Sequence, residues 1–310
     1  MHCPRLSELP PPPPGKTGWP WTEETPPVAE ALPGSYARIT IVTPSYNSIH
    51  YLEETVRSVL LQGYPDLEYI VMDGGSTDGA VDIIRKYEKW IAYWVSEKDH
   101  GYADAVNKGF ARATGDIRAW LPASDLYFPS ALRTANRYLG KRQTDFIFGR
   151  SCQLGEDGKV GRVRPMVSLS LKQLTLYGRD NPCQPATFWR SEIHQQAGEL
   201  NSRLRYAADS EWFLRLGLIG RSRSVPETVC YIRQHAGQLS SNLDSVLNEW
   251  FSAWNAVVRA QRIPRAQILL GAIFVVPLLR YRSGGWKSLF RLPNWQTLSK
   301  TIFKRSQKLL

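Results

Sequence analysis

Apolar runs and amphipathic stretches alternate regularly along the first part of the chain. Four short apolar runs have the composition of buried strands, and between them apolar residues recur at helical spacing. In one such stretch Ile49, Leu52 and Val56 lie on the same side of a helix. Strands and helices that alternate at this rhythm predict an α/β fold with a mostly parallel sheet and right-handed crossovers. The expected strands are 38–42, 67–72, 90–95 and 117–121, and the expected helices are 48–62, a second one carrying Val81, Ile84 and Tyr87, and 103–113.

The pattern changes after residue 128. Polar and apolar positions alternate on both sides of Glu156-Asp157-Gly158, a turn sequence that predicts a hairpin. Helical stretches separated by polar loops predict fewer parallel strands here and more loops that build a site. The expected helices are 129–139, 168–177, 190–197 and 207–218, and the expected strands are 145–149 and 228–233.

The first 36 residues are rich in proline, and Pro10 to Pro14 are consecutive. This composition favours extended polyproline II structure without a core of its own. We therefore expect residues 1–36 to form a disordered, extended leader. Trp19 and Trp21 are the only indication that it docks onto the rest of the chain.

Positive charge is concentrated in the last part of the chain. The net charge is +11, and the segment from Trp250 to the end contains eleven Lys and Arg and no Asp or Glu, so the remainder is balanced. Residues 242–310 are expected to form a helical, basic tail, with an apolar stretch at 266–279 that is too short to span a membrane. Tryptophans interleaved with these charges indicate attachment to an anionic membrane surface. Packing on the α/β part of the chain or a homodimer contact is the alternative.

The four cysteines are scattered and form no C-x-x-C motif. Such cysteines are typical of a reducing compartment and argue against a disulfide scaffold or a zinc site. The N-terminus lacks the pattern of a signal peptide, and no window holds the ~20 apolar residues of a spanning helix. We expect a cytoplasmic protein, peripheral on the inner face of the cytoplasmic membrane.

Polar residues follow each of the four predicted parallel strands. The apolar run 117–121, for example, ends in Pro122-Ala123-Ser124-Asp125. The carboxyl ends of parallel strands meet at one rim of a sheet, where α/β proteins bind ligands. Carboxylates that gather at such a rim are expected to accept ribose, base and metal ligands. The polar segments are 43–47, 73–78, 97–101 and 123–125.

The order of these motifs resembles glycosyltransferase family 2, whose members have the GT-A fold. The resemblance covers about residues 38–241, comprising a nucleotide-binding half (37–127) and an acceptor-binding half (128–241). Each motif is weak alone, but their order and spacing make chance a poor explanation. The motifs are TPSYN, VMDGGSTD, the helix from Gly101 to Gly109, WLPASDLY, QPATF, ADSEWFLRL and RQH followed by Ser240.

The resemblance implies which residues bind the nucleotide sugar. Asp73 would contact the base, although a turn residue before two glycines is the alternative. Glu53 and Lys108 are equally explained by solvated helix faces. The implied donor residues are Thr43, Pro44, Tyr46, Asn47, Glu53, Asp73, Gly74, Ser76, Asp99, Asp104, Lys108, Ser124 and Asp125.

The resemblance also implies a Mg²⁺ or Mn²⁺ ion held by Asp125 and helped by His235. The family usually has two adjacent acids after the fourth strand, and here Ser124 replaces the first of them. One carboxylate can suffice, because phosphate oxygens and water complete the shell of such an ion. A lone histidine is nearly as often structural, so the part played by His235 stays open.

Asp209 is the expected catalytic base, at the start of a helix whose N-terminus favours an anion. Glu211 is the reserve, since two positions along a helix it points elsewhere. Gln184, Glu211 and Trp212 are expected to line the acceptor site, although Trp212 is equally explained as core.

The resemblance implies an inverting glycosyltransferase that uses a nucleotide-diphosphate sugar, with UDP as the expected nucleotide, and a glycan or lipid-linked acceptor in cell-surface polysaccharide or glycolipid biosynthesis. The missing acid at Ser124 leaves open a catalytically weak nucleotide-sugar-binding or scaffold protein. Nucleic-acid binding is disfavoured, because the basic residues of the tail lie beside apolar runs.

Overall fold

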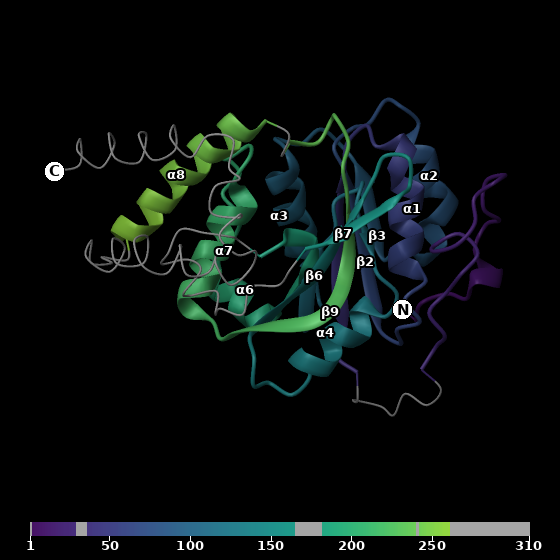
Figure 1. Ribbon diagram of the computed structural model, residues 1–310, viewed down its shortest axis with the longest axis horizontal. Coiled ribbons are helices and arrows are strands. Elements are labelled where there is room, and N and C mark those ends of the chain that lie inside the picture. Colours follow the sequence, from purple (N-terminus) through teal and green to yellow (C-terminus); the bar gives the residue numbers. More distant parts are fainter. Residues whose placement is uncertain (1, 29–35, 165–181, 240–241, 261–310) are drawn as a thin grey trace. The chain divides into compact units, whose positions relative to one another are not determined.

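The computed structural model describes residues 2–28, 36–164, 182–239 and 242–260, and all of them belong to one compact unit (Figure 1). The predicted helix at 168–177 and the apolar stretch at 266–279 lie outside the described residues. The described strands form a single sheet with the order β3-β2-β1-β4-β8-β6-β9-β5, and β7 pairs with β6.

The first half is the predicted alternation of parallel strands and helices. β1, β2, β3 and β4 are parallel neighbours. α1 and α2 cover one face of the sheet and α3 covers the other (Figure 1). The amphipathic pattern of α1 is the reason it lies there, because its apolar side, including Leu52, Val56 and Val59, is fully buried. The elements are β1 (Ile39–Ser45), α1 (Ile49–Leu60), β2 (Leu67–Asp73), α2 (Ala80–Tyr87), a 3₁₀ turn η2 (Glu88–Trp90), β3 (Tyr93–Ser96), α3 (Tyr102–Arg112) and β4 (Ile117–Trp120).

The second half mixes strand directions, as expected. β8 is antiparallel to both β4 and β6, whereas β6 is parallel to β9. The predicted hairpin at Glu156-Asp157-Gly158 joins the antiparallel strands β6 and β7. The elements are β5 (Leu126–Tyr127), α4 (Ala131–Leu139), β6 (Phe146–Leu154), β7 (Val160–Val163), a 3₁₀ turn η3 (Gln184–Ala186), β8 (Thr187–Arg190), α6 (Ser191–Ala197), α7 (Ala208–Ile219), β9 (Ser222–Arg233) and α8 (Leu243–Ala260).

Five strands differ from their predictions: β3 begins at Tyr93 and not at 90, β6 continues to Leu154 and not to 149, β5 was not predicted, and β8 and β9 differ as follows. The pattern gave no strand at β8, because Thr187–Arg190 is buried on both faces and shows no alternation. The prediction for β9 began at residue 228, whereas the strand begins at Ser222. Its register shifts against β6, and it also pairs with β5. The last part of β9 (Figure 1) therefore lies between β6 and the short edge strand β5.

An aromatic cluster fills the core between β4, β8 and α7. Trp120, Trp189 and Trp212 are each at most 1 % exposed, with ring centroids 4.9–5.9 Å apart. The indole of Trp212 also donates a hydrogen bond to the carbonyl of Gly198. Trp212 is therefore a core residue, and its expected place in the acceptor site is wrong because its side chain is enclosed.

The leader is extended, but the expectation that it is disordered is wrong for residues 2–28. Arg57 of α1, fully buried, donates hydrogen bonds to the carbonyls of Pro10, Pro20 and Trp21. The indole of Trp19 donates to the carbonyl of Tyr127. The chain at Thr25 and Pro26 passes so close to Gly63, where φ is 57°, that a side chain there would collide with backbone oxygens. The leader has no core of its own and is ordered by the domain it crosses (Figure 1).

None of the helices in the described segments is long and apolar enough to cross a membrane.

Candidate functional site

The carboxyl ends of the first three strands meet at one rim, as predicted. The strand register aligns Ser45 of β1 with Asp73 of β2, and Asp73 with Ser96 of β3. Backbone bonds continue the alignment beyond the strands, since Gly74 N–H donates to the carbonyl of Ser45 and Glu97 N–H to that of Asp73. The rim loops are thus one connected surface.

Asp73, at the end of β2, joins the second and third rim loops by hydrogen bonds. It is 2 % exposed, and its carboxylate accepts hydrogen bonds from the hydroxyls of Ser76 and Ser96, each at 2.6 Å, and from the N–H groups of Gly75 and Ser76. These bonds fit the turn interpretation of Asp73. A carboxylate oxygen can accept more than one hydrogen bond, so this geometry leaves the base-binding prediction as a prediction.

Asn47 joins the first rim loop to the second. Its backbone has φ 46°, a left-handed conformation that asparagine tolerates better than most residues. Its N–H donates to Ser76 Oγ, and its side-chain oxygen accepts from Thr77 N–H. The neighbouring Tyr46 is 64 % exposed, a large aromatic ring left open at the rim. The hydrogen bonds of Asn47 thus fix the backbone next to the exposed ring of Tyr46.

Asp99 in the third rim loop and Asp104 in the first turn of α3 each accept a local backbone hydrogen bond, from the N–H groups of Gly101 and His100 respectively. Gly74 lies against the Asp99 carboxylate, which leaves no room for a Cβ. Lys108, one turn further along α3, forms ion pairs with Glu97 and Asp104. Its geometry is that of a surface ion pair.

Other predicted donor residues do not reach the rim surface. Thr43 is fully buried and its hydroxyl is 3.1 Å from that of Tyr69, and Pro44 is half-buried within β1. Glu53 binds Lys86 and Tyr87 of α2 at 2.6 and 2.8 Å. The expectation that Glu53 contacts the donor is wrong, because its side chain faces α2.

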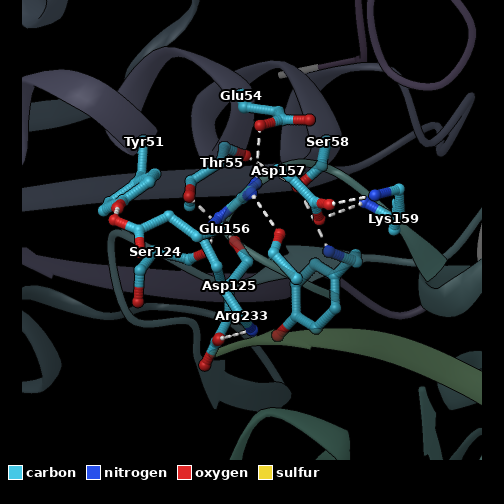
Figure 2. A network of polar contacts seen from close by, with 12 residues as sticks. Tyr51, Glu54, Thr55, Ser58, Ser124, Asp125, Glu156, Asp157, Lys159 and Arg233 are labelled. Carbon is cyan, nitrogen blue, oxygen red and sulfur yellow. Dashed lines mark hydrogen bonds and ion pairs between the residues drawn. The ribbon is translucent and has the colours of Figure 1, made fainter. Parts of the chain in front are cut away.

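The fourth rim loop meets the end of β9. The Arg233 N–H donates to Asp125 Oδ1 at 2.9 Å, and the Arg233 guanidinium donates to the carbonyl of Ser124 (Figure 2). The same guanidinium pairs with Glu54 at 2.6 Å and lies over the ring of Tyr51, 5.0 Å from its centroid. Arg233 is 3 % exposed. It therefore ties α1, the loop at Asp125 and β9 together.

Arg233 belongs to the RQH motif, but neither it nor Glu54 is among the predicted site residues. A signal was available, because α1 has two adjacent acids and an arginine buried on a strand requires an anionic partner. Choosing Glu54 over Glu53 required the rotation of α1, which the apolar face determines only to within a residue. Tyr51 and Glu156 were missed as well, and the Tyr51 hydroxyl donates to Glu156 at 2.7 Å.

Asp125 is a buried carboxylate with its charge incompletely compensated. It is 6 % exposed, and burial raises its pKa to about 7 against the opposing effects of the Arg233 N–H and charge. The ring of His235 lies 5.0 Å from that of Tyr51, beside the same arginine. Burial lowers the pKa of His235, which favours its neutral, ligating form.

The metal site of Asp125 and His235 stays a prediction: Asp125 accepts a hydrogen bond from the Arg233 N–H, and the His235 ring lies beside that of Tyr51. Within the described ranges no three His, Cys, Asp or Glu side chains gather in a metal-binding group. Mg²⁺ and Mn²⁺ accept one or two protein ligands when phosphate oxygens and water supply the rest. A cation would also offset the cost of ionising the buried Asp125.

Asp209 lies in the first turn of α7, as predicted. Its own N–H donates to the hydroxyl of Tyr102 at 3.1 Å, and Ser210 N–H donates to its Oδ1 at 2.7 Å. Tyr102 is the first residue of α3, directly after the third rim loop. Asp209 is half-buried, and burial raises its pKa. The structure thus brings the backbone of Asp209 next to Tyr102, at the end of the third rim loop.

The remaining acceptor-site predictions divide. Glu211 is buried in a bidentate ion pair with Arg215, at 2.8 and 2.9 Å, so its expected roles in acceptor binding and as reserve base are wrong. Gln184 donates to the carbonyl of Trp120, the last residue of β4. Gln184 is half-buried next to the fourth rim loop, a position compatible with an acceptor.

Comparison with known proteins identifies this arrangement. Residues 40–193 match the family model of glycosyl transferase family 2. An uncharacterized glycosyltransferase of Mycobacterium tuberculosis strain H37Rv is 34 % identical over 197 residues, which is 62 % of this chain and 73 % of that protein. The chain belongs to glycosyltransferase family 2. TuaG of Bacillus subtilis, named as a putative teichuronic acid biosynthesis glycosyltransferase, is 37 % identical over 123 residues, 39 % of this chain and 49 % of that one.

Solved glycosyltransferase structures share the fold of this family 2 enzyme. The mannosyltransferase PcManGT of Pyrobaculum calidifontis, in complex with GDP-Man and Mn²⁺, superimposes with a TM-score of 0.57 at 19 % identity, covering 92 % of this chain and 84 % of that one. S. aureus TarS 1–349 in complex with UDP-GlcNAc gives a TM-score of 0.57 at 16 % identity, covering 79 % and 81 %. At these identities the likeness shows the GT-A fold alone, as the sequence predicted.

Proposed function

We propose that this family 2 enzyme is an inverting glycosyltransferase that transfers a sugar from a nucleotide-diphosphate sugar, with UDP as the expected nucleotide, to a glycan or lipid-linked acceptor in cell-surface polysaccharide biosynthesis. One observation carries the proposal. Asp209 of the second half is bonded to Tyr102 at the third rim loop, while Asp125 ends the fourth. Burial raises the pKa of both carboxyls, Asp209 in the first turn of α7 beside Tyr102 and Asp125 in the loop after β4.

The donor is expected to lie along the rim. Tyr46, Asn47, Asp73, Gly74 and Ser76 form the part of the rim where the nucleotide is expected. The exposed ring of Tyr46 offers a stacking surface, and the loop held by Asn47 presents Ser76 beside it. TarS structures contain UDP or UDP-GlcNAc, and PcManGT contains GDP-Man, so both nucleotides belong in a test of donor choice.

Asp125 and His235 would hold a Mg²⁺ or Mn²⁺ ion, which neutralises charge on the departing diphosphate when it is bound. Asp209 accepts the proton of the acceptor hydroxyl as that oxygen forms its bond to the anomeric carbon. The bond from that carbon to the phosphate oxygen breaks at the same time, and the nucleoside diphosphate leaves with the electron pair. Attack from the opposite side inverts the anomeric configuration.

The first experiment identifies the donor. The full chain is screened by thermal shift, with and without Mn²⁺, against UDP-glucose, UDP-galactose, UDP-GlcNAc and GDP-mannose. A bound donor stabilises the fold by mass action, and a concentration 100 times Kd adds about 2.7 kcal/mol. Release of the nucleoside diphosphate is then measured with octyl glycosides as acceptors.

Asp209→Asn tests the base. We expect it to bind the donor normally and to lower turnover by about 10²- to 10⁴-fold, the usual contribution of general base catalysis. Full turnover in this variant would refute the assignment of the base. Donor binding without any nucleotide release by the native enzyme would instead favour the alternative that Ser124 suggests, a nucleotide-sugar-binding or scaffold protein.

A further inference from the structure

The segment that leads into α7 is held by a carboxylate from α8. Glu249 accepts hydrogen bonds from the N–H groups of three consecutive residues, Arg205, Tyr206 and Ala207. The distances to Arg205 and Ala207 are 2.9 and 2.7 Å. Hydrogen bonds to an ionised acceptor are roughly twice as strong as neutral ones. Glu249 therefore fixes the path of the chain two residues before Asp209.

α7 has no capping side chain of its own. Its N-cap residue is Ala207, which makes no side-chain cap, whereas Ser, Thr, Asp or Asn usually fix a helix entry. Asp209, in the first turn, relies on Tyr102 at one side of this entry and on Ser210 beside it. With Ala207 at the N-cap, the carboxylate from α8 replaces the local cap in defining where the helix begins.

Docking of α8 does not by itself account for Glu249. α8 packs against α7, and its Ala253 and Val257 are each 7 % exposed, so apolar burial joins the two helices. Glu249 is half-buried, and among the described residues its carboxylate binds the backbone N–H groups of 205–207 and no Lys or Arg side chain. α8 also lies beyond the 40–193 segment that matches the family model.

We infer that Glu249 is a positioning residue for glycosyl transfer, which sets the orientation of Asp209 through the backbone of residues 205–207. This inference rests on the proposed role of Asp209 as the base. Under this inference α8 contributes to catalysis by orienting the base in the acceptor half. The first helix of the basic tail, α8, thus fixes the backbone segment 205–207 that leads to Asp209.

Glu249→Gln is the test, because glutamine keeps the shape and loses the charge. A misplaced base lowers turnover by about 10- to 100-fold. We therefore expect kcat to fall within this range, while the Kd of the donor chosen by the thermal-shift screen stays within twofold. Hydrogen exchange followed by mass spectrometry is expected to show faster exchange of the amides of 205–209.

Two matched variants serve as controls. Asn248→Ala changes the neighbouring, exposed position of the same helix, and Glu88→Gln removes an exposed carboxylate from η2, away from α7. Both are expected to keep kcat and the exchange of 205–209 unchanged. If Glu249→Gln folds poorly, Glu249→Asp keeps the charge and withdraws it by one methylene, with the same expected split between kcat and Kd.

The outcomes separate the two proposals. Loss of turnover in Asp209→Asn together with unchanged kcat in Glu249→Gln overturns the positioning role alone. Full turnover in Asp209→Asn overturns the base, whatever Glu249→Gln does. Unchanged amide exchange at 205–209 in Glu249→Gln also overturns the positioning role, and this readout requires no acceptor. An equal loss in kcat and donor affinity would show a general structural effect and overturn it as well.

Discussion

At the scale of single residues, the site depends on how each carboxylate is compensated. Asp73 and Glu211 are buried, and their carboxylate oxygens accept hydrogen bonds from hydroxyls, N–H groups or an arginine. Asp125 accepts a hydrogen bond from Arg233 N–H, and burial keeps its pKa near 7. Asp125 is therefore the carboxylate that gains most from a bound cation.

This difference predicts a pH-dependent stability effect of Asp125→Asn. The pKa of Asp125 is higher in the folded than in the unfolded state. The contribution of this carboxyl to the free energy of unfolding is therefore greatest below the unfolded pKa, near 4, and is lost as the pH rises through about 7. Urea unfolding is measured without metal. We expect the free energy of unfolding of Asp125→Asn, relative to that of the native protein, to increase between about pH 4 and 7, by at most about 1.4 kcal/mol for each pH unit. Above that range the gain stays constant, because the carboxyl is then ionised in both states.

Mn²⁺ provides the control for this prediction. It is expected to stabilise the native protein in the presence of nucleoside diphosphate and to leave Asp125→Asn unchanged. Asp125→Ala is expected to abolish transfer. Full metal-dependent activity of that variant would refute the metal assignment.

Ser124 predicts a second effect at this scale. Ser124→Asp restores the second acid that family members usually have, and one more negative charge strengthens cation binding. We expect transfer to be retained and the Mn²⁺ concentration for half-maximal nucleotide release to fall. Ser130→Asp, on a half-buried position before α4, is the control and is expected to leave that concentration unchanged.

At the scale of elements, α1 makes three different sets of contacts. Its apolar side is buried against the sheet, Glu54 pairs with Arg233, and Arg57 holds the leader. The leader is thus ordered by a buried cation that donates to three of its backbone carbonyls and also to the hydroxyl of Tyr87. A proline-rich segment supplies such carbonyls readily, because it forms few hydrogen bonds within itself.

Arg57→Met tests this arrangement. It leaves the carbonyls of Pro10, Pro20 and Trp21 without their buried donor, at about 1–3 kcal/mol for each group that stays unsatisfied. We expect the free energy of unfolding to fall by about 3 kcal/mol in urea, and limited proteolysis to cleave within residues 2–28. Arg85→Met, at a 61 % exposed arginine of α2, should show neither change.

At the scale of the whole molecule, we propose that the basic tail addresses the enzyme to an anionic membrane. Residues 261–310 contain ten of the eleven positive charges after Trp250. A chain ending at residue 260 keeps α8 and Glu249. We expect it to retain donor binding and to lose sedimentation with vesicles that contain phosphatidylglycerol, whereas the full chain sediments with them in a salt-dependent manner. Equal sedimentation of both chains would contradict this role.

The sequence determined the elements and the edge at which they act. Hydrophobic periodicity predicted β1 to β4 and their helices, and parallel pairing then placed Asp73, Asp99 and Asp125 at one rim. These inferences succeed because they depend on local pattern and on the fixed geometry of a parallel sheet. Asp209 at the first turn of α7 follows from the same kind of local signal.

Only the tertiary structure decided which side chains face one another. It selected Glu54 over Glu53, placed Trp212 in the core, paired Glu211 with Arg215, and brought Arg233 and Glu249 to loops far away in sequence. It also ordered the leader through Arg57. Such contacts depend on the exact rotation of a helix and on long-range partners, and neither is encoded in the local spacing of apolar residues.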